Sequence, residues 1–445
     1  MAEGITRISV KGFKSLAEEC SVEVRPLTIL AGANSSGKSS IMQPLLMMKQ
    51  TLEATYDPGD LLLDGPNVRY TAAEQFLSRS KNKVGDGFEV EYDLNGSRSI
   101  REYFIRIPGK GMDIAEMTYF DLVNETTTLR PGMGHSDLLS EVTWLSDVWN
   151  NFVRIQGDEI NEKMEMRSYR FRCFLDIGYF PIKKTEDNNN ISPILVKYIP
   201  DTFGNSLREI IHISALRGNP QRTYKITAVG PQFPGRFEDY VASIVHEWQD
   251  DSDLRLKKLE EYLELLGLTR NVGAKSVDDT QVEILVGRLP VNSAENSNGN
   301  EMVSIADVGF GISQTLPVLV ALLAAKPGQL VYIEQPEIHL HPRAQTAMAQ
   351  ILADMADRGV KVVVETHSSL LLLGIQSLVA QGTLSSKCVK LHWFKRRLDD
   401  GVTEVTSADL DDAGAFGDWP EDFSSAEMDA DTRYIHAAEA RLEQN

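Results

Sequence analysis

The sequence predicts an α/β fold with a mixed sheet, helices on both of its faces, an inserted α+β middle region and a small C-terminal extension. Three observations predict this fold. A glycine-rich loop at 32–39 lies between an apolar strand and a helix. Two further apolar strands, expected at 329–334 and 360–365, each end in a carboxylate. Helical patterns alternate with these strands between residues 311 and 381, as a parallel sheet covered by helices requires.

The composition indicates a globular protein with enough apolar residues for one large core or two smaller ones. The chain has 445 residues, of which 42% are hydrophobic, and a formal net charge of −19. An acidic surface repels phosphate backbones and anionic membranes, although it does not exclude a local basic groove. The three cysteines are far apart and lack metal-ligand spacing. No signal segment or long apolar run is present, so we expect a cytoplasmic protein without membrane contact.

Four parts are expected along the chain, because the hydrophobic pattern is regular near both ends and weak in the middle. Short strand-like pieces in the middle suggest an antiparallel sheet. Sustained heptads are missing, which argues against a long coiled-coil tether. The four parts are an N-terminal lobe at 1–80, an inserted α+β region at 81–300, a C-terminal lobe at 301–385 and a small acidic C-terminal domain at 386–445.

Individual elements follow from the same periodicities. Helices are expected where apolar residues recur at helical spacing, and strands where they alternate or form short runs. The expected elements are two strands within 5–31, helices at 38–55, 136–165, 251–268, 311–325, 343–358 and 369–381, strands at 329–334 and 360–365, a hairpin after 386, and loops at 185–192 and 294–302.

The glycine-rich loop fits G-x-x-x-x-G-K-[ST], the pattern of a loop that cradles phosphates. Its glycines let backbone N–H groups approach phosphate oxygens, and the helix N-terminus that follows adds partial positive charge. We expect Lys38 to contact the β- and γ-phosphates of ATP and Ser39 to hold Mg²⁺. The alternative, a chance glycine and serine loop, fits poorly between a strand and a helix. The residues expected to contact ATP are Asn34, Ser35, Ser36, Gly37, Lys38, Ser39 and Ser40.

Three further features follow this loop along the chain. The apolar strand that ends at Glu334 has the Walker B pattern, in which a carboxylate positions Mg²⁺ through water; an ordinary strand ending at a turn is the alternative. His367 stands at the tip of the next strand, where a histidine is more often structural. Gly309 and Gly311 open the helix that leads to Glu334, and such glycines form either an anion-binding nest or a simple cap.

In this order, the four features resemble the ABC-type ATPase heads of the SMC and RecF kind. More closely, they resemble the overcoming-lysogenization-defect (OLD)-like AAA ATPases of bacteria. The resemblance spans most of 1–70 and 303–425, and it implies a P-loop NTPase fold of the ABC-ATPase head type. The segments that carry it are RISVKGFKS, LTILAGANSSGKSSI, IADVGFGISQTLPVLVALL, YIEQPEIHLHPRAQ and VVVETHSSLLL, with weaker matches at ISALRGNPQRTY and at GAFGDWPEDF in the tail.

The resemblance also implies roles for single residues. His367 takes the place of a switch histidine that touches the γ-phosphate. Gly309, Gly311 and Ser313 take the place of the signature, which binds the γ-phosphate of ATP held by a partner subunit, although the usual Leu-Ser-Gly-Gly core is absent. Gln75 lies about where a Mg²⁺-sensing glutamine would be, but an ordinary glutamine is the stronger interpretation. ATP and Mg²⁺ are the expected cofactors.

Gln335 stands where such ATPases usually carry the catalytic glutamate after the Walker B acid, here Glu334. A carboxylate can accept a proton from the attacking water, whereas an amide can only orient that water. We therefore expect hydrolysis to be slow or absent, with His367 still placed to act on the γ-phosphate. The alternative is that Glu337, two residues further on, acts as the base.

Two other patterns are interpreted as non-catalytic. His339 and His341 look like a metal pair, but the resemblance places them in a loop after Walker B at a dimer interface. Asp409 and Asp411 resemble the D-x-D of a TOPRIM nuclease. Because no clean glutamate-bearing strand precedes that motif, we expect a solvated acidic turn.

A biological role follows from the resemblance alone. Similar ATPases without an effector of their own are often found in bacterial anti-phage defence, next to a separate nuclease. We therefore expect a homodimer, or a higher oligomer of dimers, that acts as an ATP-dependent sensor or scaffold for such a nuclease. A chaperone with an unknown client is one alternative. The other is a RecF-like DNA-repair ATPase that clamps DNA, which the net charge opposes and two basic clusters favour, Arg167-Arg170-Arg172 and Lys395-Arg396-Arg397.

Overall fold

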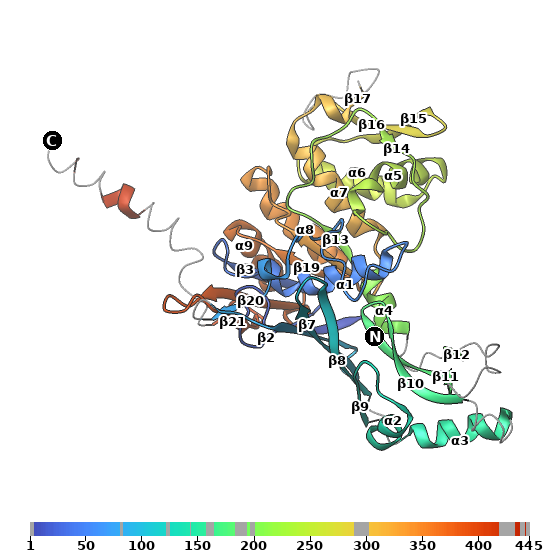
Figure 1. Cartoon of the computed structure of the whole chain (residues 1–445). Helices are drawn as coiled ribbons and strands as arrows, with labels where there is room; N and C mark the ends of the chain where they lie inside the picture. Colours follow the sequence, from blue (N-terminus) through green and yellow to red (C-terminus); the bar gives the residue numbers. More distant parts are fainter. Residues whose placement is uncertain are drawn as a thin grey trace.

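The computed structural model describes most of the chain (Figure 1). The loop expected at 185–192, residues 294–301 of the loop expected at 294–302, and most of the acidic tail after residue 417 lie outside the described residues. Within the described part, no helix has the length and apolar composition needed to span a bilayer. The structure describes residues 4–80, 83–121, 125–142, 144–156, 164–182, 194–195, 201–288, 302–417, 432–436 and 441.

A six-stranded mixed sheet forms the middle of the molecule. In spatial order its strands are β13 (Ile211–Ile213), β18 (Leu330–Glu334), β19 (Lys361–Glu365), β3 (Leu27–Gly32), β20 (Val389–Arg396) and β21 (Thr403–Ala408). Neighbouring strands run parallel from β13 to β20, and β20 and β21 run antiparallel. The mixed sheet expected from the sequence is therefore confirmed, and it unites strands from both ends of the chain with one from the middle.

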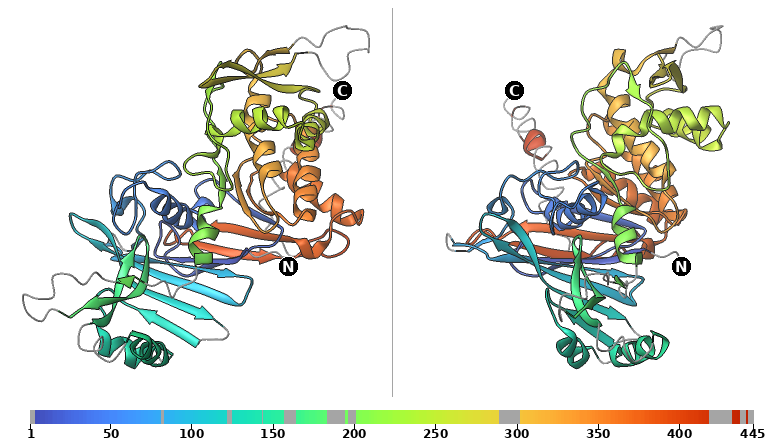
Figure 2. Two further views of the ribbon diagram at one scale, coloured as in Figure 1. Left: turned by 90° about the vertical axis from the view of Figure 1, so that its right-hand side faces the viewer. Right: turned by 45° about the vertical axis from the view of Figure 1, so that its right-hand side comes forward.

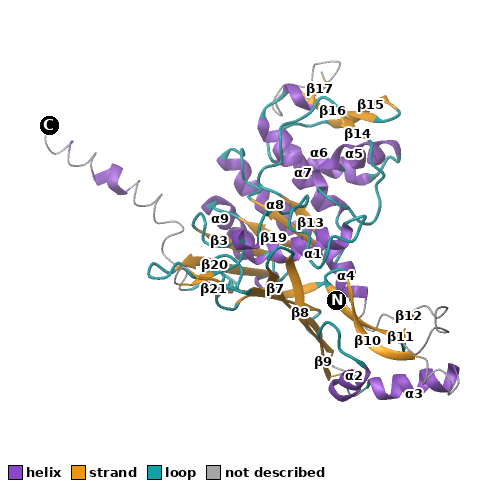
Figure 3. Ribbon diagram, in the orientation of Figure 1, coloured by secondary structure: helices purple, strands orange, loops and turns teal. Residues whose placement is uncertain are grey.

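Both faces of this sheet are covered, because each strand sends alternate side chains to opposite faces. On β3, Leu27 and Ile29 belong to one hydrophobic core, and Leu30 belongs to the other. Helices lie on both sides of the sheet (Figure 3), as the sequence predicts. The first core includes α5 (Val241–Asp250), α6 (Leu254–Leu265), α7 (Phe310–Ala324), α8 (Pro342–Asp357) and α9 (Ser369–Ala380), and the second includes α1 (Gln43–Glu53) and α4 (Asp201–Arg208).

A second six-stranded sheet is antiparallel and corrects the expectation for the N-terminus. In spatial order its strands are β2 (Cys20–Glu23), β1 (Ile5–Lys11), β6 (Gly87–Leu94), β7 (Arg98–Ile107), β8 (Gly111–Asp121) and β9 (Glu125–Leu129). The sequence predicts two strands within 5–31, but the structure has three, of which only β3 joins the central sheet. Gly12 and Lys14 have φ values of 80° and 50°, so the chain reverses after β1 and returns as β2. A four-residue strand shows too little alternation to be recognised.

The C-terminal lobe agrees closely with its sequence pattern. Helices α7, α8 and α9 and strands β18 and β19 begin and end within one residue of their expected limits. The helix expected at 38–55 is shorter, because Ser39–Ile41 forms a 3₁₀ turn and α1 begins only at Gln43, with Pro44 in its first turn.

The inserted region differs more from its pattern. The sequence predicts one helix over 136–165, but the described residues form two helices and then a strand from Met164, along which buried and less buried residues alternate. The helix expected at 251–268 is confirmed as α6. The remaining elements are β4 (Arg79–Ser80), β5 (Lys83–Val84), α2 (His135–Glu141), α3 (Leu145–Gln156), β10 (Met164–Phe171), β11 (Phe174–Pro181), β12 (Ile194–Leu195), β14 (Tyr224–Lys225), β15 (Val272–Asp278), β16 (Gln281–Gly287) and β17 (Met302–Ser304).

The expected four-part division of the chain remains a prediction, and pairing between strands crosses its boundaries. Strand β1 pairs with β6, and β20 from the expected C-terminal extension pairs with β3. Figure 2 shows the antiparallel sheet and the small sheet of β14–β17 at opposite ends of the molecule, with the central sheet between them.

Glu102 on β7 is a buried carboxyl group in the second core region. It is 0% exposed, and neither carboxyl oxygen has a hydrogen-bond partner among the described residues. Burial raises the pKa of Glu102 well above its ordinary value. The folded protein therefore keeps this proton where the unfolded chain releases it, so the contribution of Glu102 to stability falls as the pH rises above the unfolded pKa.

We predict that Glu102→Met, which removes the buried carboxyl at similar volume, raises the melting temperature by roughly a few degrees at pH 7.5 and by less at pH 5. Thermal unfolding followed by circular dichroism at the two pH values measures this difference. Glu283→Met, at a partly exposed strand position, is the control and should change little. An equal shift at both pH values for Glu102→Met would contradict the prediction.

Candidate functional site

The candidate site lies where the carboxyl ends of three parallel strands meet. β19 stands between β18 and β3, and the register places Glu334 beside Glu365 and Glu365 beside Leu30. Parallel strands end at the same edge of a sheet, so residues more than 300 positions apart come together there.

The loop after β3 requires glycine at both ends. Gly32 and Gly37 have φ values of 143° and 104°, which residues with a Cβ atom rarely adopt. A Cβ on Gly37 would also lie 2.8 Å from Ser15 Oγ and 2.8 Å from Thr403 Oγ1. The loop therefore packs between the connection from β1 to β2, which carries Ser15, and Thr403 of β21.

Lys38 lies inside this loop and is only 3% exposed. Its Nζ donates hydrogen bonds to the carbonyl oxygens of Gly32 (3.0 Å) and Ala33 (2.8 Å). Burial lowers the pKa of Lys38, while the carboxylates of Glu365 and Glu337 raise it by less. A phosphate oxygen next to Nζ would compensate this burial, so the loop can hold a nucleotide phosphate.

A pocket of about 510 Å³ opens along the loop. Ser35 to Ser40, among the residues expected to contact ATP, line it together with Glu365 and Gln75. Asn34 lines a neighbouring cavity of about 380 Å³ with His367. The side chain of Gln75 accepts a hydrogen bond from Thr71 N at 2.9 Å, which supports its interpretation as an ordinary turn residue.

Glu365 is the residue at this edge to which the sequence alone assigned no role. Ser39 Oγ donates to Glu365 Oε1 at 3.0 Å, and Tyr332 donates from its hydroxyl to Oε2 at 2.7 Å. Burial raises the pKa of Glu365, the two hydrogen bonds lower it, and the negative charge of Glu334 raises it further, so the pKa lies above its ordinary value. Its place at the end of an apolar strand, directly before Thr366 and His367, was the available signal.

Glu334 is held on the other side by the strand β13 and the segment after it. Its Oε1 lies 3.2 Å from His212 Nε2, and its Oε2 accepts a hydrogen bond from Ala215 N at 3.1 Å. Burial raises the pKa of Glu334, but the hydrogen bond and charge of His212 and the N–H of Ala215 lower it by more. Glu334 is therefore favoured as a carboxylate. No sequence pattern pointed to His212, because the strand that carries it is only three residues long.

Gln335 and Glu337 follow β18 in a tight turn. Gln335 has a φ of 47°, and its N–H donates to the carbonyl oxygen of Glu365 at 2.7 Å. Glu337 is 9% exposed, and its Oε1 accepts hydrogen bonds from Thr366 Oγ1 (2.7 Å) and His367 N (2.9 Å). Glu337 therefore ties the turn after β18 to the turn after β19, which is a structural use of this carboxylate.

His367 faces the glycine-rich loop. Loss of hydration and the charge of Lys38 lower the pKa of His367, while a hydrogen bond to the backbone of Gly32 raises it by less. The net shift is downward, so the ring is neutral at neutral pH. A neutral imidazole beside Lys38 can donate one hydrogen bond to a phosphate oxygen without adding positive charge.

The expected signature residues lie at the start of α7. Gly309 is the N-cap, and a Cβ added to it would meet nothing within 4 Å. A Cβ on Gly311 would lie 3.5 Å from His339 O, and Ser313 Oγ donates to Phe310 O at 3.2 Å. None of these residues lines the pocket at the glycine-rich loop of the same chain.

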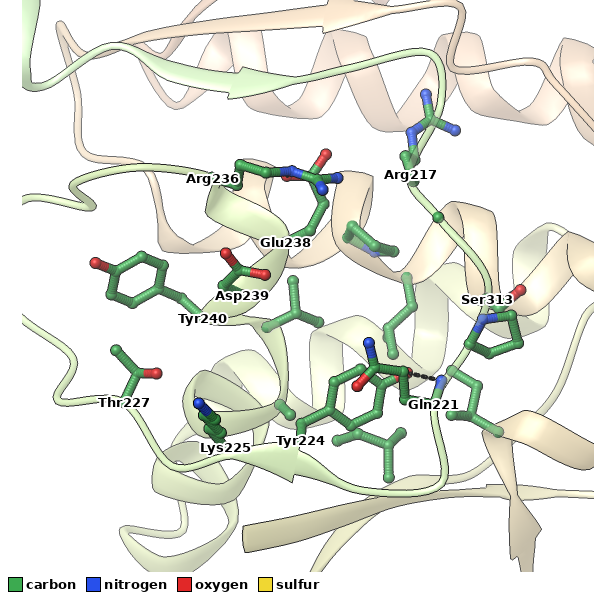
Figure 4. A pocket seen from close by; sticks show the side chains of 18 of the residues that line it. Arg217, Gln221, Tyr224, Lys225, Thr227, Arg236, Glu238, Asp239, Tyr240 and Ser313 are labelled. Carbon is green, nitrogen blue, oxygen red and sulfur yellow. Dashed lines mark hydrogen bonds and ion pairs between the residues drawn. The ribbon is translucent and has the colours of Figure 1, made fainter. Parts of the chain in front are cut away.

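The largest of the three cavities, about 700 Å³, lies between α7 and the segment after β13 (Figure 4). Ser313 and Arg217 line it, with Tyr224 and Arg236 on the walls that Figure 4 shows. It contains no residue of the glycine-rich loop. The pocket of about 510 Å³ is therefore the candidate nucleotide site, because it contains Lys38 and Gln43 at the start of α1.

The donor set at the smaller pocket fits a Mg²⁺–nucleotide complex. Mg²⁺ takes hard oxygen ligands, and Ser39 Oγ and the carboxylates of Glu365 and Glu334 lie at one edge of the sheet. Across the described ranges, no group of three or more histidine, cysteine, aspartate or glutamate residues is arranged to hold a metal by itself. Nucleotide phosphates and water would have to complete the coordination.

The patterns interpreted as non-catalytic have structural partners. The ring of His339 lies 5.8 Å from that of Phe310, and His341 Nδ1 accepts from Arg343 N at the start of α8. Asp409 accepts from Lys390 Nζ at 2.9 Å. Asp411 accepts from the backbone of its own turn, at Ala413 N and Ala415 N. These contacts agree with the interpretation of both motifs as structural.

Three residues of the two basic clusters, Arg167, Arg170 and Arg397, pair with carboxylates. Arg170 pairs with Asp57 and Asp60, and Arg167 pairs with Glu165. Arg397 pairs with acidic side chains as well, at Glu18, Asp400 and Glu404. Paired guanidinium groups offer little free charge to a phosphate backbone, so the clusters lose much of their weight as a DNA-binding signal.

Arg217 connects helix α7 with the end of strand β18. Its guanidinium donates to the carbonyl oxygens of Gln314 on α7 (3.1 Å), Glu334 (2.7 Å) and Gln335 (3.1 Å). Burial is the main influence and lowers the pKa of Arg217 to about 10. This side chain thus fixes the position of α7 relative to the end of β18.

We predict that Arg217→Ala destabilises the protein by about 3 kcal/mol or more, because three hydrogen bonds from a charged donor to buried carbonyls are lost. Arg217→Lys should show an intermediate loss. Chemical denaturation gives both values. The control is Arg222→Ala, since Arg222 is exposed and pairs with Asp307 at the surface, and we expect a change within about 0.5 kcal/mol. Equal losses for the two alanine variants would contradict the proposed role of Arg217.

Three of the solved structures similar to this chain are SMC heads, at sequence identities of 11% to 15%. "Crystal structure of the SmcHead bound to the C-winged helix domain of ScpA" has 15% identity and a TM-score of 0.47, covering 92% of this chain and 99% of that chain. The "SMC head domain from Thermotoga maritima" has 11% sequence identity and a TM-score of 0.35, and the match covers 91% of this chain and 98% of that chain. An SMC head with an extended coiled coil, bound to the C-terminal domain of ScpA from Pyrococcus furiosus, has 13% sequence identity and a TM-score of 0.44. The match covers 92% of this chain and 96% of that chain.

Two family models match, and no curated protein does. The model described as "AAA ATPase domain" matches residues 4–101, which contain the glycine-rich loop. The model described as "AAA domain, putative AbiEii toxin, Type IV TA system" matches residues 202–373, which contain Arg217, α7, Glu334 and His367. Both matched models describe AAA-type ATPase domains, and together they cover the residues of the candidate site.

Proposed function

We propose that this protein is an ATP-dependent switch in which two copies close around ATP. The observation that carries the proposal is the pocket at the glycine-rich loop, where Lys38, Ser39 and Glu365 lie within hydrogen-bond distance of the loop or of one another. The loop supplies backbone N–H groups and an ammonium for phosphates, and the sheet edge supplies oxygen donors for Mg²⁺.

The second half of the ATP site would come from a partner copy. The start of α7 carries Gly309 and Gly311 and lies outside the pocket of its own chain. Phe310, at the same helix start, is 52% exposed. A helix N-terminus with an open glycine can approach the γ-phosphate bound by another chain, so the closed dimer would persist only while that phosphate bridges the two copies.

Hydrolysis in this proposal is slow. Gln335 stands next to the Walker B acid, and an amide cannot take the proton of the attacking water. Glu337, the alternative base, is held by Thr366 Oγ1 and His367 N, which supports a structural role. ATP would then hold the closed state for long periods, and opening would follow loss of the nucleotide.

The output of the switch, in our proposal, is control of a separate effector nuclease, most simply in bacterial anti-phage defence in the cytoplasm. The matched family description names a toxin of a toxin–antitoxin system, and that statement concerns the family. The D-x-D motif at Asp409 and Asp411 is occupied by hairpin contacts, which supports an effector outside this chain. Genes next to the one that encodes this chain would identify the effector.

A DNA clamp of the RecF or SMC kind is the second candidate. The net charge of −19 and the pairing of Arg170 and Arg397 with carboxylates count against it. We predict that a 30-base-pair duplex binds at 100 mM salt no more tightly than typical non-specific complexes, with dissociation constants of about 10⁻⁶ M or weaker, with or without ATP. Fluorescence anisotropy at several salt concentrations measures this, and tight ATP-dependent binding would favour the clamp.

The switch itself is tested by comparing the wild type with Gln335→Glu and Lys38→Ala. We predict that the wild type binds ATP and turns it over slowly, that Gln335→Glu increases turnover about tenfold or more, and that Lys38→Ala weakens ATP binding about tenfold or more. Steady-state phosphate release and ATP titration measure these values, and light scattering with and without ATP gives the oligomeric state.

Lys49→Ala would be a poor control, because Lys49 is buried and pairs with Glu53. Lys326→Ala lies away from the pocket and should behave as the wild type. Brisk wild-type turnover that Gln335→Glu does not change would mean that the base is elsewhere and that the protein is a cycling motor. Normal ATP binding by Lys38→Ala would overturn the assignment of the pocket.

A further inference from the structure

Two carboxylates stand at the end of the central sheet, and the structure gives them different partners. Glu334, at the Walker B position, is engaged by His212 Nε2 and Ala215 N, both from the edge of the sheet away from the glycine-rich loop. Glu365, one strand closer to the loop, is the carboxylate that contacts Ser39. The usual assignment from sequence would give the serine and Glu334 to the same metal.

The geometry around Glu365 is that of a ligand site and not of a simple core contact. Its Oε1 lies 3.0 Å from Ser39 Oγ, and Glu365 is 6% exposed yet lines the pocket at the loop. Tyr332 is fully buried and its hydroxyl fixes Oε2 at 2.7 Å, which orients the carboxyl group toward Ser39. Carboxylates that bind cations are oriented by such neighbouring hydrogen bonds.

The local charges point to a cation that comes with the nucleotide. Glu334 and Glu365 are register partners on the adjacent strands β18 and β19, so two carboxyl groups lie side by side at the end of the sheet. Lys38 lies within the glycine-rich loop, and its Nζ donates to the carbonyls of Gly32 and Ala33. When nucleotide phosphates bind, Lys38 would turn toward the phosphates. A divalent cation near Ser39 would then balance the negative charge of the two carboxylates.

We propose that Glu365 is a carboxylate of the divalent-cation site, acting with Ser39, and that Glu334, held by His212, supports that site from its outer side. This proposal rests on the proposed function, because the cation would arrive with ATP. The chemical class is a hard, oxygen-liganded cation such as Mg²⁺ or Mn²⁺, with phosphate oxygens and water completing six ligands.

The competing interpretation is that Glu365 only fixes the positions of Ser39 and Tyr332 in the folded protein. The two interpretations predict different effects of a divalent cation on nucleotide affinity. If Glu365 has only a structural role, its substitution changes nucleotide affinity equally with and without a divalent cation. A cation ligand affects the increase in affinity that the cation provides and leaves cation-free binding almost unchanged.

The test uses the full chain and its Glu365→Gln variant, which has nearly the same size and can still accept from Ser39. The affinity for the non-hydrolysable analogue β,γ-imido-ATP is measured by calorimetry in 5 mM MgCl₂ and in EDTA, at roughly physiological salt. Binding of Mn²⁺ in the presence of the analogue is measured by electron paramagnetic resonance. Glu404→Gln, at an exposed position on β21, is the control.

We expect Glu365→Gln to reduce the Mg²⁺-dependent gain in affinity about tenfold or more and to weaken Mn²⁺ binding by a similar factor, with binding in EDTA unchanged. Glu404→Gln should match the wild type in every measurement. An unchanged Mg²⁺-dependent gain for Glu365→Gln, or an equal loss of affinity in MgCl₂ and in EDTA, would overturn the proposal.

Two further variants keep the test decisive if Glu365→Gln does not fold. Tyr332→Phe removes the hydroxyl that orients Oε2 and should lower Mn²⁺ affinity by a smaller factor while leaving cation-free binding intact. Glu365→Asp withdraws the carboxylate by one methylene and should also weaken Mn²⁺ binding; wild-type Mn²⁺ affinity in both variants overturns the proposal. Failure of the wild type to bind the analogue at all would instead refute the proposed function.

Discussion

The parallel pairing of β19 with both β18 and β3 is the constraint on which the candidate site depends. It places Glu365 beside Glu334 on one side and beside Leu30, at the start of the glycine-rich loop, on the other. A shift of one residue in this register would turn Glu365 to the opposite face of the sheet and separate it from Ser39. The buried valines of β19, Val362 to Val364, fix the register, because they divide between the two hydrophobic cores.

Around this edge, each polar group is held by an element from a different part of the chain. Ser15 and Thr403 hold the loop, His212 holds Glu334, and Arg217 connects α7 with the turn after β18. A movement at the end of β18 can therefore displace α7, since the guanidinium of Arg217 contacts both α7 and the end of β18. Gln335, in the turn after β18, has a φ of 47°, a conformation that residues other than glycine seldom adopt.

Much of this could be predicted from the sequence, because the motifs are local. The glycine-rich loop has a recognisable motif. The strands that end at Glu334 and Glu365, and the helices between them, have strong hydrophobic periodicity, and their limits agree with the structure. The contacts of His212 and Arg217 could not be predicted, because they come from a three-residue strand and an irregular segment whose partners lie 97 or more residues away.

Two sequence expectations were changed by the three-dimensional arrangement. The basic residues around Arg170 looked free along the sequence, but folding brings Asp57 and Asp60 to them. The strand β20 looked like part of a separate extension, but it pairs with β3 in the central sheet. In both cases the deciding partner lies far away in the sequence, and charge or periodicity in a local window contains no information about it.

The central claim is that ATP brings the loop of one copy to α7 of another. It is tested most directly by cross-linking two variants that each have one accessible cysteine, Asn34→Cys and Gly309→Cys, mixed in a Cys388→Ser background in which the remaining cysteines, Cys20 and Cys173, are buried. Asn34 is exposed, and a side chain at Gly309 meets nothing within 4 Å, so both changes are compatible with the fold. With a short bis-maleimide, we predict a cross-linked heterodimer with ATP and little with ADP. Saturating ATP without any cross-link, or equal cross-linking with ATP and ADP, would contradict the claim.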